Sequence, residues 1–122
     1  MKRYQIGDRT YRLDELVLDQ EEALTELLEP LYSAGETTAK GLVDGLLRQK
    51  LLRKALAVVL VPEGETVEAM DREAVAAHLG AHLTVSQQAQ VIRDFFEVNA
   101  AAIAALKALV PGAAVPKGVS IN

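Results

Sequence analysis

The 122-residue chain contains no cysteine and no tryptophan, and only 4% of its residues are aromatic. Without cysteine it can form no disulfide, thiolate metal site or thiol nucleophile, which favours a cytoplasmic protein. It also lacks an uninterrupted apolar run of about 18 residues, so no segment predicts a membrane span. The first residues turn polar too early for a secretory signal peptide. These absences argue against a secreted disulfide framework and against an integral membrane protein.

What the chain does contain is typical of one small helical domain. Half of its residues are hydrophobic, mostly Ala and Leu, and a quarter are charged, as expected for a globular protein. The net charge of −4 argues against a nucleic-acid-binding protein, which is normally basic. We predict a mainly α fold, a small helical bundle with a short N-terminal β-hairpin. It forms a single domain over residues 1–110, followed by a flexible tail at 111–122.

The hairpin is predicted at residues 2–13, where apolar and polar residues alternate in two short runs. Gly7 and Asp8 separate these runs, and a two-residue loop with glycine first favours a type II′ turn. In this register Tyr4 faces Tyr11 across the two strands. A lone hairpin is only marginally stable in water, so we expect it to pack on the helices. We expect no other regular β structure.

Helical periodicity predicts four helices, at about 19–33, 37–60, 67–80 and 85–109. Asp19 begins the first, with Glu22 completing a capping box. Thr37 or Thr38 caps the second helix. The run at 55–61 is also compatible with a buried strand, but it continues an unbroken helical pattern, so we prefer a helix there.

The ends of the last two helices are marked by other local signals. Gly80 is expected to end the third helix. Thr84 caps the fourth helix, with Gln87 at the matching position of a capping box.

The two histidines, His78 and His82, are the most plausible metal ligands. Their spacing places two rings on one face of a helix, but Gly80 is expected to break the helix between them, and no metalloprotease pattern surrounds them. The carboxylates fall on outward helix faces, and no serine lies in a catalytic pattern. We therefore expect no catalytic residue, no metal site and no cofactor, and hence no enzyme.

A basic cluster comprises Arg48, Lys50, Arg53 and Lys54. Such a cluster can contact nucleic acid, but the overall negative charge disfavours this reading. We expect the cluster to complement the acidic face of the first helix, at 21–29, either within the chain or in a partner subunit. Charge pairs of this kind select partners more than they add stability.

The last predicted helix carries two adjacent apolar stripes, wider than the arc that one core contact requires. One stripe is heptad-like and has a single polar interruption, Asn99, which would mark the register if it lies in the contact. A helix this apolar is either central in its own domain or covered by another chain. We therefore expect a homo-oligomer. The candidate partner-binding residues are Ile92, Phe95, Phe96, Asn99, Ile103 and Leu106.

The order of these features resembles the tail assembly chaperones of long-tailed bacteriophages. The resemblance covers about residues 4–100 and lies in three segments, YQIGDRTYRLDELVLDQEEALTELLEPL, KALAVVLVPEG and LTVSQQAQVIRDFFEVN. It implies an adaptor that binds the long, helical, aggregation-prone tape measure protein. Such an adaptor helps recruit tail tube subunits and leaves before the tail is complete. Many members of the family also exist in a longer, frameshifted form.

The leading hypothesis is thus a non-enzymatic chaperone in the bacterial host cytoplasm, absent from the mature virion. Its expected partners are the tape measure protein and the tail tube protein, with no nucleic acid and no membrane. The alternative is a small helical DNA-binding regulator that uses 84–99 in a helix-turn-helix. Asp94 and Glu97 oppose it, because phosphate repels an acidic helix face.

Overall fold

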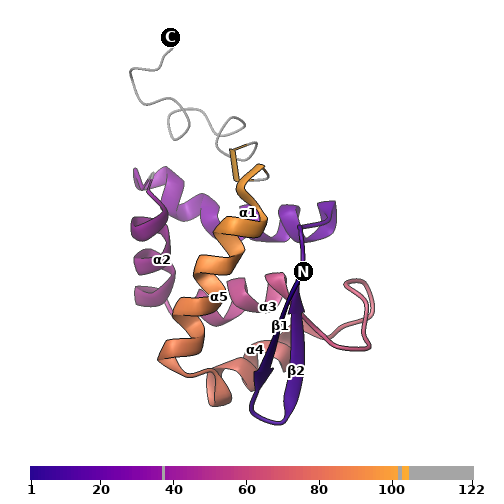
Figure 1. Cartoon of the computed structure of the whole chain (residues 1–122). Coiled ribbons are helices and arrows are strands. Elements are labelled where there is room, and N and C mark those ends of the chain that lie inside the picture. Colours follow the sequence, from indigo (N-terminus) through magenta and orange to yellow (C-terminus); the bar gives the residue numbers. More distant parts are fainter. Residues whose placement is uncertain (37, 102, 105–122) are drawn as a thin grey trace.

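The computed structural model describes residues 1–36, 38–101 and 103–104 (Figure 1). The fold is mostly helical and begins with a hairpin, as predicted. The helices and strands are β1 (Lys2–Ile6), β2 (Arg9–Leu13), α1 (Leu18–Ser33), α2 (Ala39–Arg48), α3 (Leu52–Val59), β3 (Leu60–Pro62), α4 (Arg72–His82) and α5 (Val85–Val98). No described helix is both long and apolar enough to cross a membrane. The predicted tail at 111–122 and the end of the last predicted helix at 105–109 lie outside the described residues. Within them the prediction of one helix from 85 onward is wrong at its end, because Asn99 leaves the helical conformation (φ −112°, ψ 29°) and α5 ends at Val98.

The predicted hairpin is confirmed, including its register. Strands β1 and β2 are antiparallel, and Tyr4 pairs with Tyr11. Gly7 has a φ of 59°, as the first loop position of a type II′ turn requires. On one side of the hairpin Ile6, Tyr11 and Leu13 are each 0% exposed, while Tyr4 on the same side is half-buried. The alternation of apolar and polar residues in the sequence therefore predicts correctly which side of the hairpin faces the protein interior.

The expectation of no further β structure is wrong, because β3 pairs with β2 and makes a three-stranded antiparallel sheet in the order β1-β2-β3. Leu60 pairs with Leu13, and the N–H of Glu63 donates to the carbonyl of Thr10 (2.8 Å), which prolongs the pairing. The open edge of β2 needs hydrogen-bond partners. Residues 60–62, which follow α3, provide these partners in an extended conformation, so the helix ends at Val59.

The helix predicted over 37–60 is two helices, α2 and α3, separated by a corner at residues 49–51. Lys50 adopts a φ of 61°, a left-handed conformation that ends the helical hydrogen bonding. Thr38 caps α2 as predicted, accepting a hydrogen bond from the N–H of Gly41. The corner lets α3 enter the interior, where six of its eight residues are buried. Helix α3, and not the last helix, is therefore the central helix among the described residues.

The start of α1 differs from the prediction by two residues. The N-cap is Val17, not Asp19, and its N–H donates to Oε1 of Gln20 (3.0 Å). Gln20 is buried and also donates from Nε2 to the carbonyl of Val58 in α3 (2.8 Å). The helix therefore begins at the cap that the buried Gln20 amide stabilises through two hydrogen bonds, and not at the predicted Asp19–Glu22 capping box nearer the surface.

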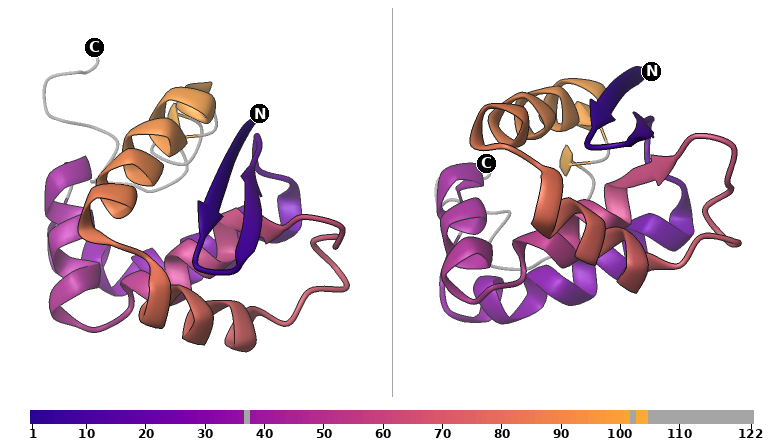
Figure 2. Two further views of the ribbon diagram at one scale, coloured as in Figure 1. Left: turned by 60° about the horizontal axis from the view of Figure 1, so that its bottom comes forward. Right: turned by 90° about the horizontal axis from the view of Figure 1, so that it is seen from below.

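Helix α4 begins after its cap Asp71 and runs through Gly80 to His82, so the expected break at Gly80 is wrong. The predicted Thr84–Gln87 capping box of α5 is confirmed. Figure 2 shows α5 between α2 on one side and the hairpin on the other. Polar contacts fasten α5 on the hairpin side, among them the bond from the Tyr4 hydroxyl to Oδ2 of Asp94 (2.7 Å).

Candidate binding groove

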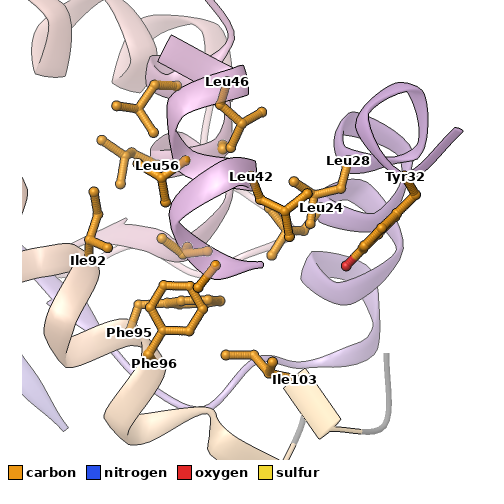
Figure 3. A pocket seen from close by; sticks show the side chains of 15 residues that line it. Leu24, Leu28, Tyr32, Leu42, Leu46, Leu56, Ile92, Phe95, Phe96 and Ile103 are labelled. Carbon is orange, nitrogen blue, oxygen red and sulfur yellow. The ribbon is translucent and has the colours of Figure 1, made fainter. Parts of the chain in front are cut away.

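An apolar groove lies between α5 and the three helices α1, α2 and α3 (Figure 3). Its cavity volume is about 150 Å³. Ligand sites usually enclose roughly 300–1,000 Å³, whereas a cavity of about 150 Å³ lined by leucine, isoleucine and phenylalanine can hold a benzene molecule. The groove therefore suits one inserted apolar side chain better than a cofactor.

The lining of the groove is apolar apart from one phenol, Tyr32. Helix α5 contributes Ile92, Phe95 and Phe96, and Ile103 adds to the same wall. The opposite wall and floor are lined by Leu24, Leu28, Tyr32, Ala39, Leu42, Val43, Leu46, Leu52, Ala55, Leu56 and Val59. No side chain of this lining carries a formal charge. The arrangement can therefore select apolar shape, and Tyr32 is the one ionisable side chain among the described lining residues.

A close approach between α1 and α2 builds one wall of the groove. Gly45 in α2 is buried, and a Cβ at this position would lie 2.8 Å from Cδ2 of Leu31 in α1. A larger residue would push the two helices apart, so this glycine serves packing. In the sequence it reads only as a weak helix former, because nothing local reveals which helix lies against it.

Four of the six predicted partner-binding residues line this groove, namely Ile92, Phe95, Phe96 and Ile103. All four are half-buried. Phe95 also packs against the buried core, and its ring meets that of Phe96 edge-on, with centroids 5.4 Å apart. Leu106 lies outside the described residues. These four side chains thus face the chain's own groove, which they leave partly open.

Asn99, the fifth predicted residue, is turned into the protein and is only 1% exposed. Its Oδ1 accepts a hydrogen bond from the N–H of Leu16 (2.8 Å), and its Nδ2 donates to the carbonyls of Phe95 (3.3 Å) and Asp14 (3.5 Å). This side chain joins the end of α5 to the connection between β2 and α1. Asn99 is therefore not part of the groove surface.

The two histidines, considered above as metal ligands, lie against the hairpin, where His78 forms hydrogen bonds. His78 and His82 share one face of α4, with ring centroids 4.6 Å apart. Nδ1 of His78 lies 2.7 Å from the Tyr11 hydroxyl, and Nε2 lies 2.9 Å from Oδ1 of Asp8. The hydrogen bond with His78 lowers the pKa of Asp8, and burial raises the pKa of Tyr11.

This contact fastens the hairpin to α4. A histidine between a carboxylate and a hydroxyl has the form of a catalytic triad, but Tyr11 is fully buried and its raised pKa makes it a poor nucleophile. Within the described ranges, no group of three or more His, Cys, Asp or Glu side chains is placed to hold a metal ion.

Comparison with known proteins adds no relative: no protein-family model, no curated protein and no solved structure matches this chain.

Proposed function

We propose that this protein is a non-enzymatic tail assembly chaperone of a long-tailed bacteriophage, which binds helical segments of the tape measure protein and assists assembly of the tail tube. The observation that carries the proposal is the open groove between α5 and α1–α3, with its apolar lining. A groove of this kind accepts the apolar face of an amphipathic helix, whose anchors recur at every third or fourth residue. The resemblance in sequence order supplies the identity of that helix.

The chemistry of the groove suits a transient partner. A buried Leu or Phe side chain contributes roughly 1.5–3 kcal/mol, and a cavity of about 150 Å³ receives one such anchor. A complex held by a single deep anchor dissociates readily, as a factor that leaves before completion of the tail requires. In this proposal, the four helices around the groove form an open helical bundle that a partner helix completes. The complex forms in the host cytoplasm, and the chaperone is absent from the mature virion.

Two groove residues test the proposal without disturbing the core. Ile92 and Phe96 line the groove but do not belong to the buried core or to the side chains packed against it. We expect Ile92→Glu and Phe96→Glu to abolish binding of helical tape measure peptides, because a carboxylate in an apolar site loses its hydration. Fluorescence anisotropy with overlapping peptides of the tape measure protein from the same phage genome measures this.

Val85→Glu is the matched control. This residue lies on the same helix and is 81% exposed, so the same change of charge falls outside the groove and should leave binding intact. Failure of every tape measure peptide to bind, or equal loss in the control, would contradict the proposal. A genome without a tape measure gene near this one would also count against it.

We also propose that the free protein self-associates through the α5 side of the groove, which the tape measure helix later occupies. Leaving apolar surface in water costs about 25 cal/mol per Å², and a second copy can cover it. Light scattering should find an oligomer that Phe96→Ala weakens while the helical circular dichroism signal persists. A wild-type protein that remains monomeric at high concentration refutes self-association but leaves peptide binding open.

A further inference from the structure

A second, wider hollow adjoins the groove. Leu52 and Leu56 of α3 line both of them. The groove follows α2 from Ala39 to Leu46, which spans about 10 Å at 1.5 Å per residue. The second hollow lies at the C-terminal end of α2, where its lining includes Leu47 of α2, Lys50 of the corner and Arg53 of α3. Figure 3 shows Leu46 and Leu56 well apart from Tyr32 and Ile103, which line the other end of the groove.

The side of the groove next to the second hollow differs in charge from its far end. Lys50 and Arg53 are exposed at the second hollow, and neither makes an ion pair within 4.0 Å in the part of the chain that the structure describes. Among the described residues, the end at Tyr32, Ala39 and Ile103 has no cationic side chain in its lining. The expected pairing of the basic cluster with the acidic face at 21–29 is therefore not found among the described residues.

The position of Arg53 depends on a glycine of the neighbouring helix. A Cβ at Gly80 would lie 2.5 Å from Nη1 and 2.6 Å from Cζ of Arg53. The missing side chain at Gly80 thus lets the guanidinium lie against α4, at the mouth of the hollow. Gly80 does not end α4, and the Arg53 guanidinium occupies the space that a Cβ at this position would take.

We propose that the groove binds its partner helix in one direction, with the C-terminal, acidic end of that helix over Lys50 and Arg53. This inference rests on the proposed function, because it requires a helix in the groove. The C-terminus of a helix carries about half a negative charge, and acidic side chains in its last turn add to it. The opposite orientation would bring the positive helix N-terminus against two cations. Copies of the protein on one tape measure helix would then all point the same way.

Two synthetic peptides with an identical Leu/Ile face and capped ends test the direction. One carries two Glu residues in its last turn, and the other carries them in its first turn. Because Glu placement changes the helicity of each free peptide, the measured quantity is the ratio of the two Kd values, compared between protein variants. At low salt we expect Lys50→Glu/Arg53→Glu to shift this ratio at least about fivefold against the peptide with the acidic last turn.

Lys54→Glu provides the matched control, and combining it with Arg48→Glu gives a double variant with the same change of charge as Lys50→Glu/Arg53→Glu. Lys54 lies next to Arg53 but lines neither the groove nor the second hollow, and Arg48 likewise lines neither. The control should leave the ratio unchanged within about twofold, since only long-range charge is altered. An equal shift in the control, or no shift in the Lys50/Arg53 variant, overturns the direction.

The outcomes separate the two proposals. If both peptides bind and no variant changes their ratio, the direction is wrong and the helix-binding function stands. If neither this pair nor any tape measure peptide binds, both proposals fail. A duplex DNA that binds through Lys50 and Arg53 and displaces the peptides would show that these cations contact phosphate, and it would overturn the inference in favour of a nucleic-acid partner.

Discussion

Replacement of Asn99 by alanine tests whether this residue fastens the fold or marks an interface. In the structure, Asn99→Ala removes the only side-chain acceptor that the N–H of Leu16 has among the described residues (2.8 Å), together with two donated hydrogen bonds. A buried group left without its partner costs about 1–3 kcal/mol. We therefore expect the free energy of unfolding to fall by about 2–3 kcal/mol. For a chain of this length each kcal/mol lowers Tm by about 4 °C.

Urea unfolding followed by circular dichroism measures this change, provided that the slope with denaturant stays constant. Glu97→Ala is the control, because that side chain is exposed and its ion pair with Lys2 (3.5 Å) lies at the surface. Such a pair contributes little, so the control should lose less than about 1 kcal/mol. If Asn99→Ala is as stable as the wild type but weakens an oligomer, the residue is a register mark at an interface and our assignment is refuted.

Three further predictions follow from other contacts. The hydrogen bond from Tyr4 lowers the pKa of Asp94 below its usual 3.8. The ionised Asp94 therefore contributes its full stabilisation of the fold above about pH 3.8, and this contribution is lost as the pH falls through the lowered pKa. Tyr4→Phe should accordingly cost about 1.5–3 kcal/mol at pH 7 and less at pH 2, and an equal cost by urea unfolding at both pH values would contradict this. Gly7→Ala should destabilise the fold more than Gly64→Ala in thermal melts: both have positive φ (59° and 88°), but only at Gly7 would a Cβ lie 2.7 Å from a histidine ring. Titration with zinc or nickel should leave Tm unchanged, whereas a rise of many degrees that His78→Ala removes would demonstrate a metal site.

Local sequence signals predicted the features that depend on neighbouring residues. The hairpin and its register follow from alternation and from the Gly7-Asp8 loop. The caps at Thr38 and Thr84 follow from side chains that reach a backbone N–H within three residues. In each case the interacting groups lie close together in the chain, so composition and spacing suffice.

The features that depend on distant residues were missed. Strand β3 forms because Leu60 meets Leu13, and neither segment alone indicates the other. The corner at Lys50 has a positive φ without the glycine that would signal it. The apolar stripes on the last predicted helix identified one wall of the groove. The opposite wall could not be predicted, because the packing of α1 against α2 depends on the contact of Gly45 with Leu31.

The attachment of α5 has a consequence for how selective the groove can be. On its hairpin side α5 is held by directional bonds, including those from Tyr4 to Asp94 and from Gln87 to the carbonyl of Gln5 (2.7 Å). Among the described residues, no hydrogen bond or ion pair links α5 to α1, α2 or α3 across the groove. Apolar contact has no preferred direction, so side chains of different sizes can enter without breaking a bond. If a helix binds in this groove as proposed, its recognition would be degenerate: one protein would bind many dissimilar sites along a long partner, and the sequence of that partner could drift without loss of binding.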